Sequence, residues 1–248
     1  MPERNLTIVL VHGAFADASG WYGVIPKLKA RGYNVIAPPN PLRSIKTDAA
    51  SVAGLLASIK GPIVLVGHSY GGAVITNAAQ GSGNVKALVY VDGFALDEGE
   101  SAASISDHFP GDKLVTALAP PVPLPDGGQD LYISEEKFHA QFAADVPADL
   151  ANLMFVTQRP LTVAAVTEAS GPPAWKTIPS WFIYGSADKA IPLGALELMA
   201  KRANPREIVV IDGGSHVVMV SQPDAVAALT LRAAQAVAEV QSDTATAK

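Results

Sequence analysis

Apolar residues in this chain gather in short continuous runs, separated by longer segments where apolar and polar residues alternate at helical spacing. Continuous Val, Ile and Leu runs are typical of strands buried on both faces, and the helical spacing is typical of helices that cover them. The alternation predicts an α/β fold with about six mostly parallel strands and helices on both faces. The expected strands are Thr7–Val11, Asn34–Ala37, Ile63–Val66, Ala87–Val91, Ser180–Tyr184 and Glu207–Ile211.

Helical periodicity fills most of the intervals between these strands. We expect the second helix to be capped by Thr47, with Asp48 favourably placed in its first turn. The expected helices are Trp21–Ala30, Asp48–Ile59, Tyr70–Gln80, Gly194–Arg202 and Asp224–Val240.

The alternation stops between Leu96 and Lys176, where a Pro- and Gly-rich stretch precedes further helical signals. We therefore expect residues 1–95 and 177–248 to form one α/β domain. Residues 96–176 would form a helical lid, inserted before the last two strands. Open α/β sheets bind ligands at the carboxyl edge of the sheet, so the lid should lie there. The helical signals of the lid are Glu135–Ala144, Ala148–Gln158 and Leu161–Ala169.

The composition fits a globular domain and argues against several classes of function. Of 248 residues, 49% are hydrophobic and 17% charged, and the formal net charge is −5. Nucleic-acid binding needs clustered Lys and Arg, and no such cluster occurs. Without cysteine there is no disulfide and no thiol nucleophile. The first apolar run is too short to cross a membrane, and no signal-type cleavage site follows it, so we expect a soluble cytoplasmic protein.

The segment Gly67-His68-Ser69-Tyr70-Gly71-Gly72 lies between a predicted strand and a predicted helix. A serine on a sharp strand-to-helix turn stands above the sheet edge, beside the first amides of the helix. Glycines at such a turn allow neighbouring backbone to pass where a Cβ would not fit. The context therefore predicts that Ser69 is a nucleophile.

A serine hydroxyl needs a base within hydrogen-bond reach, and the base needs a group that orients it. His216 follows the last predicted strand, so its loop opens onto the same sheet edge as Ser69. We expect His216 to be the base. Asp188 follows the strand before it and is the favoured acid, because the order Ser, Asp, His is typical of this architecture. Asp92, at the end of another strand, is the rival.

A serine nucleophile also needs hydrogen-bond donors for the oxyanion that forms during the reaction. One expected donor is the backbone amide of Tyr70. The other should come from the loop after the first strand, where Gly13 would let the amide of Ala14 face Ser69. The amide of Phe15 is the fallback donor, and its ring is a candidate wall of the pocket. His12 is expected to be structural.

These motifs resemble those of the α/β-hydrolase superfamily over nearly the whole chain. Within it, the opening Val11-His12-Gly13-Ala14 is similar to a small lid-bearing carboxylesterase group that includes plant methylesterases, hydroxynitrile lyases and bacterial esterases. The resemblance implies a Ser69–His216–Asp188 triad with an oxyanion hole of Ala14 and Tyr70. The segments that carry it are His12-Gly13-Ala14, Gly67-His68-Ser69-Tyr70-Gly71-Gly72, Gly185-Ser186-Ala187-Asp188 and Gly214-Ser215-His216.

The expected activity is hydrolysis of a small carboxylic ester through an acyl-enzyme, without metal or organic cofactor. The chain would be a monomer or a homodimer. Alternatives on the same fold are a lactonase, a cofactor-independent dioxygenase, a haloperoxidase-like protein, a lyase, or a ligand receptor that barely turns over. The resemblance implies that a lyase needs a lysine from the lid, and no motif marks Lys113, Lys137 or Lys176. The lid residues expected to close over substrate are Phe138, Phe142, Met154 and Phe155.

Overall fold

The computed structural model describes residues 5–111 and 114–246. Its main sheet has six strands, all paired in parallel, in the order β2-β1-β3-β4-β8-β9. The predicted α/β fold is confirmed, and each predicted strand is present with bounds close to those expected. The strands are β1 (Thr7–Val11), β2 (Asn34–Ile36), β3 (Ile63–His68), β4 (Val85–Val91), β8 (Ser180–Gly185) and β9 (Glu207–Ile211).

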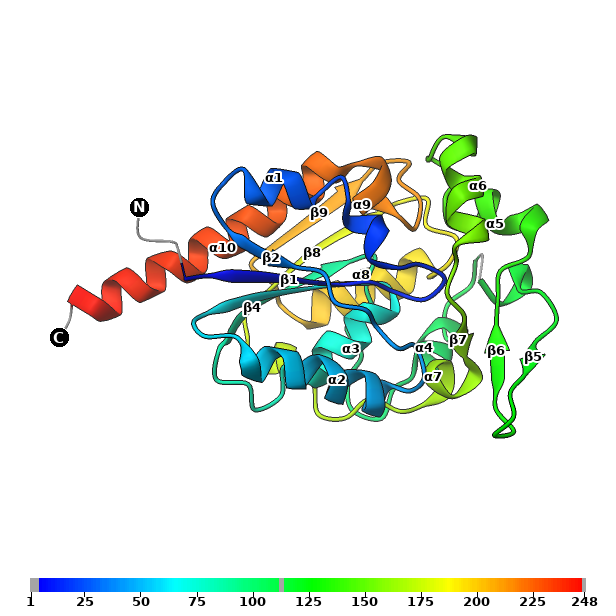
Figure 1. Cartoon of the computed structure of the whole chain (residues 1–248), viewed down its shortest axis with the longest axis horizontal. Coiled ribbons are helices and arrows are strands. Elements are labelled where there is room, and N and C mark those ends of the chain that lie inside the picture. Colours follow the sequence, from blue (N-terminus) through cyan, green and yellow to red (C-terminus); the bar gives the residue numbers. More distant parts are fainter. Residues whose placement is uncertain (1–4, 112–113, 247–248) are drawn as a thin grey trace.

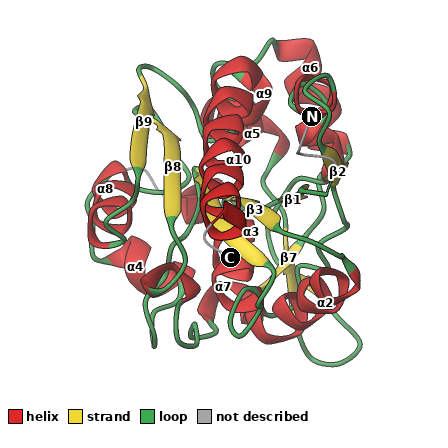
Figure 2. Ribbon diagram, turned by 90° about the vertical axis from the view of Figure 1, so that its left-hand side faces the viewer, coloured by secondary structure: helices red, strands yellow, loops and turns green. Residues whose placement is uncertain are grey.

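Helices cover both faces of this sheet (Figure 1). Strands β1, β3 and β8 are buried along their whole length, which explains their continuous apolar sequences. Strands β2 and β9 form the two edges and are more exposed, and Figure 2 shows β9 beside β8 at its edge. One face carries α1 (Ile25–Lys29) and α10 (Pro223–Thr246), and the other carries α2 (Ile45–Ser58), α3 (Tyr70–Ala78) and α8 (Leu193–Arg202).

Two helix starts differ from the sequence-based expectation. The first predicted helix is divided into a 3₁₀ turn, Ala18–Trp21, and α1, because Pro26 is tolerated only in the first turn of a helix. The second helix begins at Ile45. Its N-cap is Ser44, whose side chain accepts a hydrogen bond from the Thr47 amide, so the prediction of Thr47 as the cap is wrong.

The chain between β4 and β8 lies beyond the carboxyl ends of the main strands (Figure 1). Besides helices it contains a three-stranded antiparallel sheet, β5-β6-β7, so the expectation of a purely helical segment is incomplete. Strands this short carry no readable alternation of polar and apolar residues. The elements are α4 (Ala102–Asp107), two 3₁₀ turns (Leu114–Ala117 and Ala174–Lys176), β5 (Val122–Pro123), β6 (Gln129–Leu131), α5 (Glu135–Phe142), α6 (Ala148–Val156), β7 (Leu161–Thr162) and α7 (Val163–Thr167).

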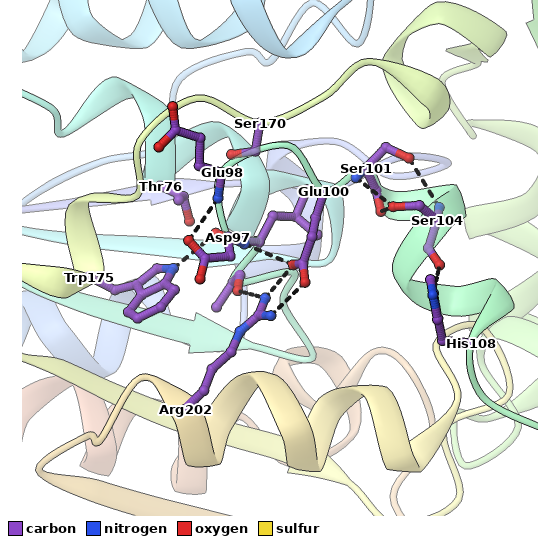
Figure 3. A network of polar contacts seen from close by, with 12 residues as sticks. Thr76, Asp97, Glu98, Glu100, Ser101, Ser104, His108, Ser170, Trp175 and Arg202 are labelled. Atoms are coloured by element: carbon purple, nitrogen blue, oxygen red, sulfur yellow. Dashed lines mark hydrogen bonds and ion pairs between the residues drawn. The ribbon is translucent and has the colours of Figure 1, made fainter.

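Both ends of this inserted chain are fastened to α8 (Figure 3). The Arg202 guanidinium donates to both carboxylate oxygens of Glu100. It also donates to the carbonyl of Ala95, over 2.8 Å. It also lies 5.7 Å from the centre of the Trp175 ring. The Trp175 indole in turn donates to the Leu96 carbonyl over 3.0 Å. The entry and exit of the inserted chain are therefore held side by side on one helix of the main domain.

Candidate active site

Ser69 lies at the junction of β3 and α3 in a strained conformation, with φ of 51° and ψ of −124°. A left-handed φ is uncommon for a residue with a side chain. Close packing of backbone enforces the turn. A Cβ added at Gly67 would lie 2.5 Å from the Gly71 carbonyl oxygen, and one at Gly71 would lie 2.6 Å from that of Val11. The glycines therefore occur where the backbone leaves no room for a side chain, and the turn presents the Ser69 hydroxyl at the sheet edge.

The structure brings Ser69, His216 and Asp188 into one hydrogen-bonded line. The Nε2 atom of His216 lies 2.8 Å from the Ser69 Oγ, and its Nδ1 atom lies 2.7 Å from the Asp188 Oδ2. A carboxylate only accepts, so Nδ1 carries the proton and Nε2 is free to accept the serine proton. The other oxygen of Asp188 accepts from the amides of Ala190 and Ile191, which fix the carboxylate. All three side chains are buried.

Asp92, the rival acid, has no hydrogen bond to His216 among the described residues. Its oxygens accept instead from the backbone amides of Gly185 and Val218, at 2.8 and 3.4 Å. Burial raises the pKa of Asp92 well above its ordinary value, and the nearby charge of Asp188 raises it further. Asp92 therefore links the end of β8 to the backbone just after His216, and through these hydrogen bonds it helps to position His216.

Two other histidines surround the site without reaching Ser69. The amide of Asn40 donates to the Nε2 of His12 over 2.9 Å, so Nδ1 is the protonated nitrogen and donates to the Gly13 carbonyl. The Nε2 of His68 donates to the carbonyl of His216 over 2.9 Å and so holds the backbone of that residue. Burial lowers the pKa of both His12 and His68, which keeps them neutral. The contact of His68 with His216 had no signal in the sequence.

The loop after β1 packs directly on Ser69. A Cβ at Gly13 would lie only 2.6 Å from that of Ser69, so Ala14 is carried to the edge of the site. Ala14 and Tyr70 line the same cavity as Ser69 and His216. The Tyr70 amide is the first of α3 and lacks an intrahelical partner. The amide of Phe15 donates to the Arg159 carbonyl over 3.0 Å, so the prediction of Phe15 as a fallback donor is wrong.

A mostly apolar cavity of about 220 Å³ opens at Ser69. The Phe15 ring lines it, as expected, but the other four predicted substrate contacts do not. Phe138 and Phe142 pack on each other with ring centres 5.1 Å apart, and Phe142 lies 5.1 Å from the His216 ring. They form a second layer behind the site. Met154 and Phe155 pack against the apolar core of the molecule, and Phe155 contacts Phe138 there. Other residues that line the cavity are Phe94, Ala102, Leu114, Leu131, Leu161 and Ile191.

Charged and metal-binding groups are scarce around this cavity. Neither Lys137 nor Lys176 is among the residues described as lining it; Lys137 donates to the Thr116 carbonyl, and Lys176 pairs with Asp97. Lys113 lies outside the described residues. Across residues 5–111 and 114–246 no cluster of three His, Asp or Glu side chains is arranged to hold a metal ion. None of the helices described in this range is long and apolar enough to span a membrane.

Comparison with known proteins gives distant relatives over nearly the full length of the chain. The chain is 26% identical to an alpha-hydroxynitrile lyase of Arabidopsis thaliana over 250 residues, covering 89% of this chain and 94% of the relative. It is 28% identical to a pyrethroid hydrolase of Sphingobium wenxiniae, covering 94% and 89%. The solved structure of a pyrethroid hydrolase from Sphingobium faniae superposes with a TM-score of 0.73 at 24% identity, over 94% of this chain and 99% of that one. This structural likeness concerns the fold.

The profile of the alpha/beta hydrolase family matches residues 8–229, from the first strand into the first turns of α10. The relatives and this match agree with the resemblance inferred from the motifs and support a carboxylesterase-type enzyme. The strained turn at Ser69, the parallel sheet below it and the matched profile lead to one conclusion: the chain belongs to the alpha/beta hydrolase family.

Proposed function

We propose that this protein hydrolyses apolar carboxylic esters, with Ser69 as nucleophile, His216 as base and Asp188 as the acid that orients it. The observation that carries the proposal is the hydrogen-bonded line from Asp188 through His216 to Ser69, which ends beside the amides of Ala14 and Tyr70. A base in this tautomer and a serine on this turn are what acyl transfer to serine requires.

The reaction would proceed in two steps. Ser69 Oγ attacks the ester carbonyl while His216 Nε2 takes its proton, and Asp188 stabilises the resulting imidazolium. The amides of Ala14 and Tyr70 receive the negative charge that develops on the carbonyl oxygen. The imidazolium then protonates the departing alcohol. A water molecule, deprotonated by His216, releases the acid from the acyl-enzyme.

The cavity limits the substrate class. Its lining is mostly apolar and includes no Lys or Arg, so an anionic substrate would lose its hydration without gaining a counter-charge. We therefore favour neutral esters with an apolar group beside the scissile bond. The name of one relative, Methylesterase 3 of Arabidopsis thaliana, agrees with an ester substrate, and that of a second, a pyrethroid hydrolase, agrees with hydrolysis.

Residues 96–176 would act as the lid of this cavity, since Leu114, Leu131 and Leu161 line it. The lid does not favour the lyase alternative suggested by the hydroxynitrile lyase relative. A lyase of this group is expected to place a lysine at the site, and none is among the cavity residues described.

Substitution of the serine tests the proposal. Ser69→Ala should lower kcat for a p-nitrophenyl ester by about three to six orders of magnitude, with little change in Tm. A fluorophosphonate probe should label the unaltered protein once, at Ser69. Ser58→Ala, at the exposed end of α2, is the matched control and should keep full activity and labelling. Retained activity in Ser69→Ala, or labelling at another serine, would contradict the proposal.

A substrate series separates the remaining alternatives. We expect p-nitrophenyl esters and an aryl methyl ester to be cleaved more efficiently than lactones of similar size. A higher kcat/KM on the lactones would reassign the activity to lactone hydrolysis. Slow turnover of every ester, combined with tight ligand binding, would indicate a receptor.

A further inference from the structure

One short segment of the inserted chain, residues 159–162, lies against the proposed oxyanion hole. Its Leu161 lines the cavity. The carbonyl of Arg159 accepts from the amide of Phe15 over 3.0 Å, and Phe15 directly follows Ala14, one of the two proposed oxyanion donors. The inserted chain therefore holds the loop of this donor directly.

The same segment also holds the turn before α2, and it does so at Arg43. The Arg43 guanidinium donates to the Pro160 carbonyl over 2.8 Å and pairs with Asp130 of β6 at 2.6 Å. The hydroxyl of Thr162 donates to the Arg43 carbonyl. The preceding residue, Leu42, is fully buried and has a φ of 63°, which is uncommon for a bulky side chain. Such a conformation persists only where the surroundings enforce it, so the position of Arg43 is closely determined.

Asp48, in the first turn of α2, connects Arg43 to Tyr70. The Arg43 amide donates to both carboxylate oxygens of Asp48, at 2.9 and 3.2 Å. The Tyr70 hydroxyl donates to the Oδ2 of Asp48 over 2.9 Å. Asp48 is fully buried and is not among the residues described as lining the cavity, so Tyr70 extends from the cavity wall into the main domain. These bonds join the first turn of α2 to the first residue of α3, whose amide is the second proposed donor.

We propose that Asp48 is a positioning residue for the oxyanion hole, and that it transmits the docking of the inserted chain on Arg43 to the amide of Tyr70. This inference rests on the proposed function, because that function gives the Tyr70 amide its role. An oxyanion donor is effective when it already points to the place where charge develops. The inserted chain then holds both donors, the one at Ala14 directly and the one at Tyr70 through Arg43 and Asp48.

A purely structural role for Asp48 makes a different prediction. Loss of its hydrogen bonds would then lower Tm and leave the chemistry at Ser69 unchanged. The rate at which a fluorophosphonate labels Ser69 separates the two roles, because this reaction also places negative charge on an oxygen in the oxyanion hole. The measurement needs no knowledge of the natural substrate.

Removal of one hydroxyl is the first test. Tyr70→Phe keeps the ring and loses the bond to Asp48. We expect the rate constant of labelling and kcat for a p-nitrophenyl ester each to fall about tenfold, less than for a missing donor, while KM changes less than about threefold. Tyr90→Phe is the matched control, because the Tyr90 hydroxyl is also buried and shares a hydrogen bond of 2.8 Å with Thr76. It should lower Tm without slowing labelling.

A second pair of variants tests the connection to the inserted chain. Arg43→Met loses the ion pair with the inserted chain and should slow labelling by about three- to tenfold. Glu100→Gln, which weakens the ion pair with Arg202 of α8, is the control and should label at the unaltered rate. Arg43→Met and Tyr70→Phe together should lose less than the product of their separate losses, because both act through Asp48.

Substitutions of Asp48 itself separate geometry from charge. The Arg43 amide and the Tyr70 hydroxyl both bond to Oδ2, and the amide oxygen of an asparagine can accept from both. Asp48→Asn should therefore label within about threefold of the unaltered rate, whereas Asp48→Ala should slow labelling about tenfold or more. If Asp48→Ala does not fold, Tyr70→Phe decides.

Failure of this inference and failure of the proposed function give different results. If the unaltered protein is not labelled at Ser69, both are overturned. If it is labelled there, and Tyr70→Phe or Arg43→Met reacts at the same rate, only the positioning role is overturned. The positioning role is also overturned if Tyr90→Phe or Glu100→Gln slows labelling as much as these variants do.

Discussion

At the scale of single residues, two buried carboxyl groups lie near His216, and their hydrogen bonds separate their roles. Asp188 accepts from the imidazole, whereas Asp92 accepts only from backbone amides among the described residues. Asp188 therefore determines which imidazole nitrogen is protonated. Asp92 determines where the end of β8 and the backbone after His216 lie. An amide in place of each carboxylate should have different consequences.

Asp188→Asn should lower kcat by about three to four orders of magnitude, because an amide cannot hold the proton on the Nδ1 of His216 in the same way. Asp92→Asn should lower kcat by less than about tenfold, because the carbonyl oxygen of an asparagine still accepts from Gly185. Steady-state kinetics on a p-nitrophenyl ester compare the two directly. The opposite ranking would make Asp92 the acid.

Local sequence predicted the placement of Ser69, Asp188 and His216 because each follows a strand at the same sheet edge. The cavity wall was less predictable. Phe138 and Phe142 lie four residues apart on one face of α5, which shows that they share a surface but not which neighbour covers it. In the structure Phe142 packs on Phe15 and His216, and Phe138 packs on Phe155, so neither ring faces the cavity. The Phe15 amide was assigned wrongly because its partner, Arg159, is remote in sequence.

At the scale of elements, the six main strands were predictable because their sequences are mostly continuous apolar runs. Helix starts were harder to predict from the sequence, because Ser44 and Thr47 are both residues that cap helices well. The strands β5, β6 and β7 depend on pairing between distant segments, which no local pattern reports. The turn between β3 and α3 lies between these cases. Its glycines are visible in the sequence, but the reason for each is a contact with other backbone.

This difference predicts opposite effects for two glycine-to-alanine changes. Gly71→Ala should lower the free energy of unfolding by about 1–3 kcal/mol or more, because its Cβ would meet the backbone oxygen of Val11. Gly54→Ala, on an exposed position within α2 with open space around it, should raise it by about 0.5–1 kcal/mol. Urea denaturation measures both. A stabilising Gly71→Ala would mean that the turn is looser than the structure indicates.

At the scale of the whole molecule, the inserted chain contacts three loops of the candidate site, those that carry Ala14, Asp188 and His216. Arg159 accepts from the amide of Phe15, next to Ala14. Gln141 donates to the carbonyl of Lys189, next to Asp188, over 2.6 Å. Asp145 accepts from the hydroxyl of Ser215, next to His216. The inserted residues therefore hold the three loops in addition to covering the cavity.

Two glutamines of the inserted chain separate these roles. Gln141→Met removes the donor to Lys189 and should lower kcat/KM about three- to tenfold, through a less fixed Asp188. Among the described residues, the side chain of Gln158 bonds only to the backbone of Ile133, inside the inserted chain, at 2.9 and 3.1 Å. Gln158→Met should lower the free energy of unfolding by about 1 kcal/mol, as Gln141→Met does. It should leave kcat/KM nearly unchanged. Equal kinetic losses in both variants would mean that the contact with Lys189 matters only for stability.

The buried histidines make the stability of the whole domain depend on pH. Burial lowers the pKa of His12 and of His68, so the unfolded chain binds protons below about pH 6.5 that the folded chain does not. The free energy of unfolding should therefore fall as the pH decreases from 7 to 5, by up to about 1.4 kcal/mol per pH unit for each histidine.

Asp92 makes the free energy of unfolding depend on pH in the opposite direction. Because its pKa is raised, the stability it contributes is complete below about pH 4 and is lost as the pH rises through the raised value. Urea denaturation of Asp92→Asn from pH 7 to 5 removes the contribution of Asp92, and adding His68→Gln should reduce the slope of the free energy of unfolding against pH by up to about 1.4 kcal/mol per pH unit. An unchanged slope would mean that His68 is protonated in the folded protein.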